Sequence, residues 1–216
     1  MSAENVNLWR TAEHALGYLA RADAIPHRTE GEGVLLEFLP RPLRRVLDLG
    51  SGDGRLLTLV RLARPEAEGV AVDFSDAMLE RLRERFAAEP RVAVLRHDLN
   101  DPLPASLGTF DAVVSSFAIH HVPHPRKRAL YEEVWTALEP GGAFLHLEHV
   151  ASPTPRLHAQ FLAAIGVTPE DDDPSNKLLD VETQLGWLRE IGFVDVDVVM
   201  KVFELAVIVA RRADIE

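Results

Sequence analysis

Short apolar runs alternate with longer amphipathic stretches through the middle of the chain. Five such runs predict buried strands, and segments with apolar residues at helical spacing separate them. Alternation of this kind predicts an α/β fold, a doubly wound and mostly parallel sheet with right-handed crossovers and helices on both faces. The five runs are residues 46–49, 69–73, 92–95, 110–116 and 143–150.

Helical patterns also precede the first run. Residues 5–22 repeat apolar side chains at near-helical spacing, and Pro26 with two glycines then breaks the pattern. A second helix is predicted over about 32–38, ending before Pro40. Residues 1–43 are therefore predicted to form an N-terminal helical lid on the sheet.

The last third of the chain interrupts the rhythm. Residues 151–180 hold a predicted short helix, about 156–165, and an acidic loop, and we expect them to form a substrate or lid insertion. A helix capped by Asp180 and ended by Gly192 follows. Two strands, about 194–200 and 203–209, are too close for a helical crossover and should pair antiparallel.

Composition narrows the function classes. The chain of 216 residues fits one domain, with a core at 44–150 and a helix and hairpin at 181–216. It has no cysteine, which excludes disulfides and thiolate metal sites. No signal peptide or membrane-spanning run is recognised, so a cytoplasmic protein, monomeric or homodimeric, is expected. The net charge of -11 disfavours nucleic-acid binding without excluding it.

A glycine-rich turn follows the first strand. Gly50, Gly52 and Gly54 stand at alternate positions, with Asp48 before them and Asp53 among them. This spacing is neither the dinucleotide fingerprint nor a phosphate loop. Two carboxylates would repel a pyrophosphate but suit a ligand that carries an ammonium or sulfonium group.

Carboxylates also end the next two strands. Asp73 lies about 20 residues beyond the glycine turn, where an acidic side chain can accept hydrogen bonds from ribose hydroxyls. Asp98 follows the third strand, and His121 and His149 follow the fourth and fifth. Because ligands bind at the carboxyl ends of such strands, these side chains are expected to share one site.

These motifs resemble those of the class I S-adenosylmethionine-dependent methyltransferases. The resemblance rests on Asp48 to Gly54, Asp73, residues 97–99, residues 115–121 and residues 138–142, in that order and spacing. It implies a seven-stranded sheet with one antiparallel strand and S-adenosylmethionine as cofactor, with S-adenosylhomocysteine as product.

The resemblance also implies roles for single residues. The turn, including Ser51, would pass beneath the methionine part of the cofactor, and Asp48 would orient its ammonium. Asp73 would accept from the ribose and Asp98 from the adenine amino group. The other residues expected at the cofactor are Arg28, as a partner for its carboxylate, and Phe74, Met78, Leu99, Ser115, Ser116 and His121.

The reaction expected is methyl transfer by in-line displacement to an oxygen or nitrogen of a small molecule. A hydroxyl or a protonated amine would need a general base. His121, His149 and Glu148 are the candidates, because histidine titrates near neutrality. His146 and Glu148 share a strand face that His149 does not, so no metal site is predicted.

Three alternatives remain open from the sequence. The chain could modify RNA, it could alter the cofactor itself for tRNA modification, or it could bind cofactor as a non-catalytic partner subunit.

Overall fold

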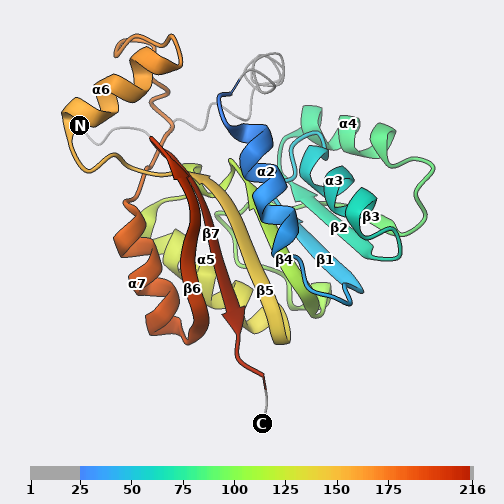
Figure 1. Ribbon diagram of the computed structural model, residues 1–216. Coiled ribbons are helices and arrows are strands. Elements are labelled where there is room, and N and C mark those ends of the chain that lie inside the picture. Colours follow the sequence, from blue (N-terminus) through green and yellow to red (C-terminus); the bar gives the residue numbers. More distant parts are fainter. Residues whose placement is uncertain (1–24, 215–216) are drawn as a thin grey trace.

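A seven-stranded sheet forms the centre of this computed structural model, which describes residues 25–214 (Figure 1). The strand order is β3-β2-β1-β4-β5-β7-β6. The strands are β1 (Arg45–Leu49), β2 (Glu68–Asp73), β3 (Val92–Arg96), β4 (Phe110–Ser116), β5 (Leu138–His149), β6 (Phe193–Val202) and β7 (Leu205–Arg212).

All strand pairs from β3 to β5 are parallel, whereas β7 runs antiparallel to both β5 and β6. The predicted single antiparallel strand is therefore β7. Chain order reverses at β1, which pairs with β2 on one side and β4 on the other. A crevice between such strands is where α/β sheets bind ligands.

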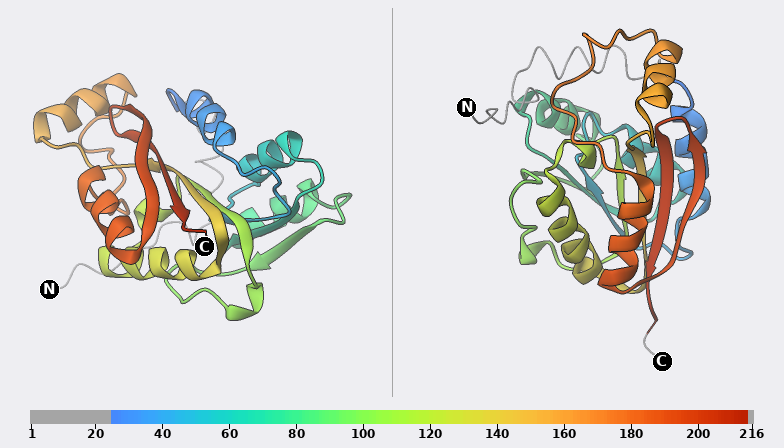
Figure 2. Two further views of the ribbon diagram at one scale, coloured as in Figure 1. Left: turned by 60° about the horizontal axis from the view of Figure 1, so that its bottom comes forward. Right: turned by 90° about the vertical axis from the view of Figure 1, so that its left-hand side faces the viewer.

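Helices cover both faces of the sheet, as Figures 1 and 2 show. Apolar side chains of α2, α3 and α4 pack on one face in one core cluster. Those of α5 and α7 pack on the other face in a second cluster. The helices are α2 (Arg28–Glu37), α3 (Arg55–Ala63), α4 (Asp76–Arg85), α5 (His124–Ala137), α6 (Pro155–Ala164) and α7 (Val181–Ile191), with short 3-10 turns η2 (Ala105–Leu107) and η3 (Ile119–His121).

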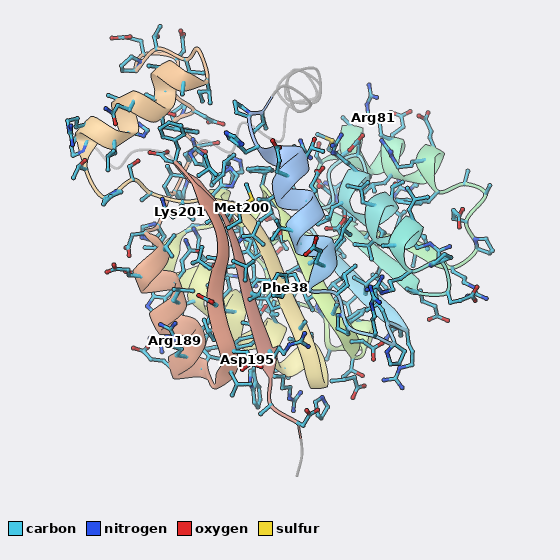
Figure 3. The ribbon with its side chains drawn as sticks, in the orientation of Figure 1. Phe38, Arg81, Arg189, Asp195, Met200 and Lys201 are labelled. Carbon is cyan, nitrogen blue, oxygen red and sulfur yellow. The ribbon has the colours of Figure 1, made fainter. Side chains whose placement is uncertain are left out.

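On the face of the sheet that α2 covers, part of the surface of β5, β7 and β6 has no helix on it among residues 25–214 (Figure 1). A shallow groove there is lined by Phe38, which follows α2, and by Asp195 of β6. Figure 3 places Phe38 beside this face and Asp195 and Met200 along β6. Met200 is half-buried against the core.

Several boundaries differ from the predictions. Helix α2 begins at Arg28 rather than near Glu32. Its N-cap residue is His27, which has a left-handed backbone (φ 62°), and Gly31 and Gly33 lie within the helix. β5 begins at Leu138 rather than near Ala143, and Pro140 to Gly142 lie in an irregular part of the strand between its pairs Phe110–Leu138 and Ala112–Ala143 with β4. Phe203 belongs to the turn between β6 and β7. The helix predicted over 5–22 lies outside the described residues.

Candidate active site

The carboxyl ends of β1, β2 and β4 surround a cavity with about 880 Å³ of empty volume, part of it open to solvent. Most residues expected at the cofactor line it. They are Arg28, Asp48, Gly50, Ser51, Gly52, Asp53, Asp73, Phe74, Met78, Asp98, Leu99, Ser116 and His121.

The glycine turn brings the backbone close to this cavity. Gly50 (φ 66°) adopts a left-handed conformation, and a Cβ there would lie 2.3 Å from the Ala118 Cβ. Gly52 (φ 57°) is also left-handed, but a Cβ there would meet no atom within 4 Å. Its N–H donates to Oδ2 of Asp73 (2.9 Å), which joins the turn to the end of β2.

Gly54 has a different role from the other two glycines. It precedes α3 with φ 86°, and a Cβ would lie 2.6 Å from the Phe86 ring. It does not line the cavity, and neither does Ser115, whose hydroxyl donates to the Leu49 carbonyl (2.9 Å). These two predicted cofactor residues therefore pack against the strands and helices around the site instead of lining the cavity.

Asp48 is the most unusual group in the cavity wall. It is fully buried, and neither carboxylate oxygen has a hydrogen-bond partner among the described residues. Burial, with the charge of the nearby Asp73 adding to it, raises the pKa of this carboxyl to about 7, while Ser51 and the Leu57 backbone act in the opposite direction. A buried carboxylate without a partner is costly unless a ligand supplies a donor.

Asp73 and Asp98 are already fixed by backbone donors. Asp73 accepts from Gly52 N–H and, through Oδ1, from Ser75 N–H (2.9 Å). Burial raises its pKa, against those hydrogen bonds. Ser75 occupies the N-cap position of α4, but its side chain makes no capping bond. Asp98 accepts from the backbone N–H of Asn100 at 3.0 Å.

Two guanidinium groups also lie in the cavity wall. Arg28 and Arg55 both line the cavity, and both bind the buried carboxylate of Glu32, at 2.9 Å and 2.8 Å. The Arg28 guanidinium also lies 5.4 Å from the centre of the Phe117 ring. Each of these guanidinium groups therefore has a buried carboxylate partner and also lies at the cavity.

His121 lines the cavity from η3, held by a neighbour far along the chain. Its Nδ1 lies 3.0 Å from the hydroxyl oxygen of Ser175, and its ring centre lies 4.0 Å from that of His120. Burial and, to a smaller extent, the neighbouring His120 lower the pKa of His121 to about 2. An imidazole with such a pKa is neutral but a weak base.

A buried ionic cluster lies behind His121. Glu148, with no exposed surface, has Oε1 2.5 Å from Nδ1 of His120 and Oε2 2.7 Å from Nε2 of His146. Burial alone would raise the pKa of Glu148, but the two histidines hold it well below its ordinary value. Burial lowers the pKa of His120.

Two predicted bases therefore do not line the cavity. Glu148 is enclosed by histidines, and His149 points to Glu204, with Nε2 2.8 Å from Oε2. Sequence reasoning missed Glu32, Arg55 and Ser175, because partners 23 and 54 positions apart carry no local signal. The one available hint was Arg55, which directly follows the last glycine of the turn.

Residues 25–214 contain neither a candidate metal site nor a membrane-spanning helix. No group of three or more histidine, aspartate or glutamate side chains there could hold a metal ion. None of the helices in this range is long and apolar enough to cross a membrane.

Comparison with known proteins adds a family. A methyltransferase domain model matches residues 46–142, which span β1 to the start of β5. A demethylmenaquinone methyltransferase from Clavibacter sepedonicus is 34% identical over 168 residues, 71% of this chain and 66% of the relative. A carboxy-S-adenosyl-L-methionine synthase from Klebsiella pneumoniae is 27% identical over 84% of this chain and 80% of the relative.

Solved structures share the fold at low identity. An O-methyltransferase family protein from Burkholderia thailandensis superposes with a TM-score of 0.71 at 21% identity, over 87% of this chain and 57% of that one. Human N-acetylserotonin methyltransferase in complex with S-adenosylmethionine gives 0.70 at 19%, over 95% and 58%. The chain thus spans about two thirds of the demethylmenaquinone methyltransferase and a little over half of these structures. By its motifs, its relatives and its sheet order, the chain belongs to the class I S-adenosylmethionine-dependent methyltransferases.

Proposed function

We propose that this chain transfers the methyl group of S-adenosylmethionine to a small organic acceptor at the cavity between Asp48, Arg28 and His121. The observation that carries the proposal is the buried Asp48 carboxylate, which lines the cavity and has no donor within hydrogen-bond geometry among residues 25–214. An ammonium group bound there would supply the missing hydrogen bonds and the compensating charge.

The other cavity residues fit the same cofactor. The guanidinium groups of Arg28 and Arg55, which line the cavity, suit the carboxylate of its amino-acid end. Asp73 keeps lone pairs for ribose hydroxyls, because a carboxylate accepts more than the two backbone bonds it has. Asp98 would accept from the adenine amino group, with Leu99, Phe74 and Met78 against the ring.

The cofactor supplies a sulfonium that is activated for displacement, so the protein mainly aligns the acceptor and excludes water. We propose that Phe117 and His121, which line the cavity from the segment after β4, align the acceptor. We further propose that residues 151–180 close the acceptor side, because Ser175 contacts His121. Residues 25–43, the described part of the predicted N-terminal lid, would flank the same opening as part of a single domain.

The acceptor class follows from the weak basicity of His121. An imidazole with a pKa of about 2 takes a proton poorly from a hydroxyl or an ammonium. We therefore propose a phenolic or enolic acceptor, which ionises in solution and reacts at oxygen or at a ring carbon. The names of relatives that methylate demethylmenaquinone and that act as C-methyltransferases agree with this class.

The test is an assay with methyl-labelled S-adenosylmethionine and a panel of small phenols, enols and amines. We expect S-adenosylhomocysteine together with a labelled phenol or enol. Labelling of amines alone would contradict the acceptor class. Labelled RNA with no labelled small molecule would favour an RNA-modifying enzyme, and cofactor binding without turnover would favour a partner subunit.

A second candidate is modification of the cofactor itself. The carboxy-S-adenosyl-L-methionine synthases match 84% of this chain and 80% of their own length, further than the demethylmenaquinone methyltransferase does. The Arg28 and Arg55 wall would suit a second carboxylate. Mass spectrometry separates the two functions, because this one replaces a methyl hydrogen of S-adenosylmethionine by a carboxyl group from a carboxylic-acid co-substrate and so yields a nucleoside heavier by the mass of CO2.

A further inference from the structure

A second cluster of titratable side chains lies outside the cavity, where β5, α6 and the turn between β6 and β7 meet. Glu204, in that turn, has no exposed surface and lies between two histidines. Its Oε2 is 2.8 Å from Nε2 of His149 at the end of β5, and its Oε1 is 2.8 Å from Nδ1 of His158 on α6. The other ring nitrogen of His158 lies 3.4 Å from a carboxylate oxygen of Asp172.

The turn holds Glu204 firmly in this place. Phe203 precedes it in a left-handed conformation (φ 49°), and the Glu204 carbonyl accepts from Val150 N–H at 2.7 Å. The backbone of Glu204 is therefore fixed to the end of β5, and its carboxylate belongs to the sheet rather than to α6. His158 and Asp172, both about one third exposed, belong to the segment that reaches it.

Among the residues that the structure describes, helix α6 makes few other contacts. It stands above the strands, away from the two helix layers (Figures 1 and 2). Within α6, all of which the structure describes, Phe161 and Leu162 are the buried side chains. The Phe161 ring lies 5.2 Å from that of His149. Among the described residues, loss of the His158 contacts would leave mainly the apolar contacts of Phe161, with the His149 and Phe203 rings, and of Leu162 to hold the helix.

We propose that His158, clamped between Glu204 and Asp172, is a protonation-dependent latch that holds α6 and the acidic loop against the end of β5 beside the cavity. The titratable groups that face it are Glu204 from the turn, Asp172 from the loop and, across Glu204, His149 from β5. Protonated His158 pairs with two carboxylates at once, whereas the neutral ring loses both ion pairs.

The pH range in which the latch closes follows from these groups. The hydrogen bond to Glu204 raises the pKa of His158 above its ordinary 6.5, and the charges of Glu204 and Asp172 add to it. Burial would raise the pKa of Glu204, but His149, Ser152 and His158 lower it. The ion pair is thus complete in mildly acidic to neutral solution, and it is lost as the pH rises through the raised pKa of His158.

The latch lies next to the candidate active site. The His149 ring is 5.5 Å from that of His120, whose ring centre lies 4.0 Å from that of the cavity-lining His121 at a tilt of 45°. The same segment reaches the cavity again through Ser175. Opening of α6 would therefore loosen the acceptor side of the site, whereas the latch itself does not depend on any transfer reaction.

Hydrogen–deuterium exchange of the full chain tests the latch without cofactor or acceptor. Exchange of α6 peptides, corrected for intrinsic rates, is compared between about pH 6 and pH 9 in the wild type, His158→Gln, His158→Arg and a control, His27→Asn. His27 is another histidine beside a glutamate, Glu30 at 3.6 Å, and asparagine tolerates its left-handed backbone.

We expect wild-type and control protection of α6 to fall several-fold as the pH rises, while protection of β1 peptides stays constant. His158→Gln should give low protection at every pH, and His158→Arg, with a permanent charge, should keep it high at pH 9. Asp172→Asn, in the exposed loop, should move the wild-type midpoint to lower pH. Unchanged α6 protection across this range, or a His158→Gln variant with wild-type protection at pH 6, would overturn the proposal.

Discussion

Asp48 sets the clearest expectation at the scale of a single residue. Its raised pKa means that the ligand-free protein loses stability as the pH rises from about 4 to about 7, because the carboxyl ionises in the unfolded chain while the buried group stays protonated. A bound ammonium reverses this preference, since it binds the ionised form. S-adenosylhomocysteine affinity should therefore rise with pH up to about 7 and then level off, as calorimetric titrations across this range would measure.

Asp48→Asn should separate the two effects. We expect the variant to bind S-adenosylhomocysteine about ten- to a hundredfold more weakly, since a hydrogen bond to a charged group contributes about 1.5–3 kcal/mol. Without ligand it should unfold at higher temperature than the wild type at pH 8. Asp76→Asn, which removes an exposed carboxylate paired with Arg96, is the control and should change neither quantity.

His121 should stay neutral throughout the neutral pH range. Burial beside His120 keeps its pKa far below its ordinary value, so its imidazole resonances should not titrate between about pH 5 and pH 9 in an NMR experiment. Resonances of His158 should titrate above 6.5 in the same spectra. A midpoint near neutrality for His121 would restore it as a general base and contradict the acceptor class proposed above.

Glu148 should matter for stability first. Glu148→Ala leaves His120, His146 and the His149 N–H without their buried acceptor, so we expect a loss of about 3–5 kcal/mol in the free energy of unfolding. Glu132→Ala, which removes an exposed partner 3.8 Å from Arg128, should cost less than about 1 kcal/mol. Chemical denaturation measures both, and equal losses would mean that the buried cluster contributes nothing special.

The glycine turn makes a prediction at the scale of an element. Gly52→Ala would place a methyl group in open space beside the cavity, so it should cost about 1 kcal/mol of stability but impair cofactor binding. Gly54→Ala would clash with Phe86 and Leu82, so it should cost clearly more stability and spare the affinity of the folded protein. Melting curves and ligand titrations of the two variants should rank them in opposite orders.

The elements also show what the sequence could reveal. Runs of apolar residues and the turn residues between them indicated β1 to β5, and Asp180 and Gly192 marked both ends of α7, because these signals are local. Asp48, Asp73 and Asp98 were expected together because parallel strands end at one edge. The Arg28–Glu32–Arg55 group and the Ser175 contact to His121 depend on packing between distant elements, which no local pattern encodes.

The same limit explains the revised view of the histidines. Position after a strand suggested a base at His121 and His149, because histidine titrates near neutrality when exposed. Burial and a neighbouring ring lower the pKa of His121, and Glu204 engages His149 from the turn between β6 and β7. Neither desolvation nor a partner 55 positions away can be seen in the strand itself.

At the scale of the whole molecule, topology explains why the site lies where it does. The chain order reverses at β1, and the ends of β1, β2 and β4 then face one cavity that Asp48, Arg28 and Arg55 line. A carboxylate and two guanidinium groups in one cavity fit a zwitterionic amino-acid end with a nucleoside beside it. It does not fit a pyrophosphate, which Asp48 and Asp53 would repel.

The most direct measurement of this central claim is a thermal-shift titration with S-adenosylmethionine, S-adenosylhomocysteine and NAD side by side. Either sulfur ligand at a hundred times its dissociation constant should stabilise the folded state by about 2.7 kcal/mol, a shift of several degrees at this size, and NAD should give none. A shift with NAD alone, or none with either sulfur ligand in folded protein, would contradict the assignment of the cavity to S-adenosylmethionine.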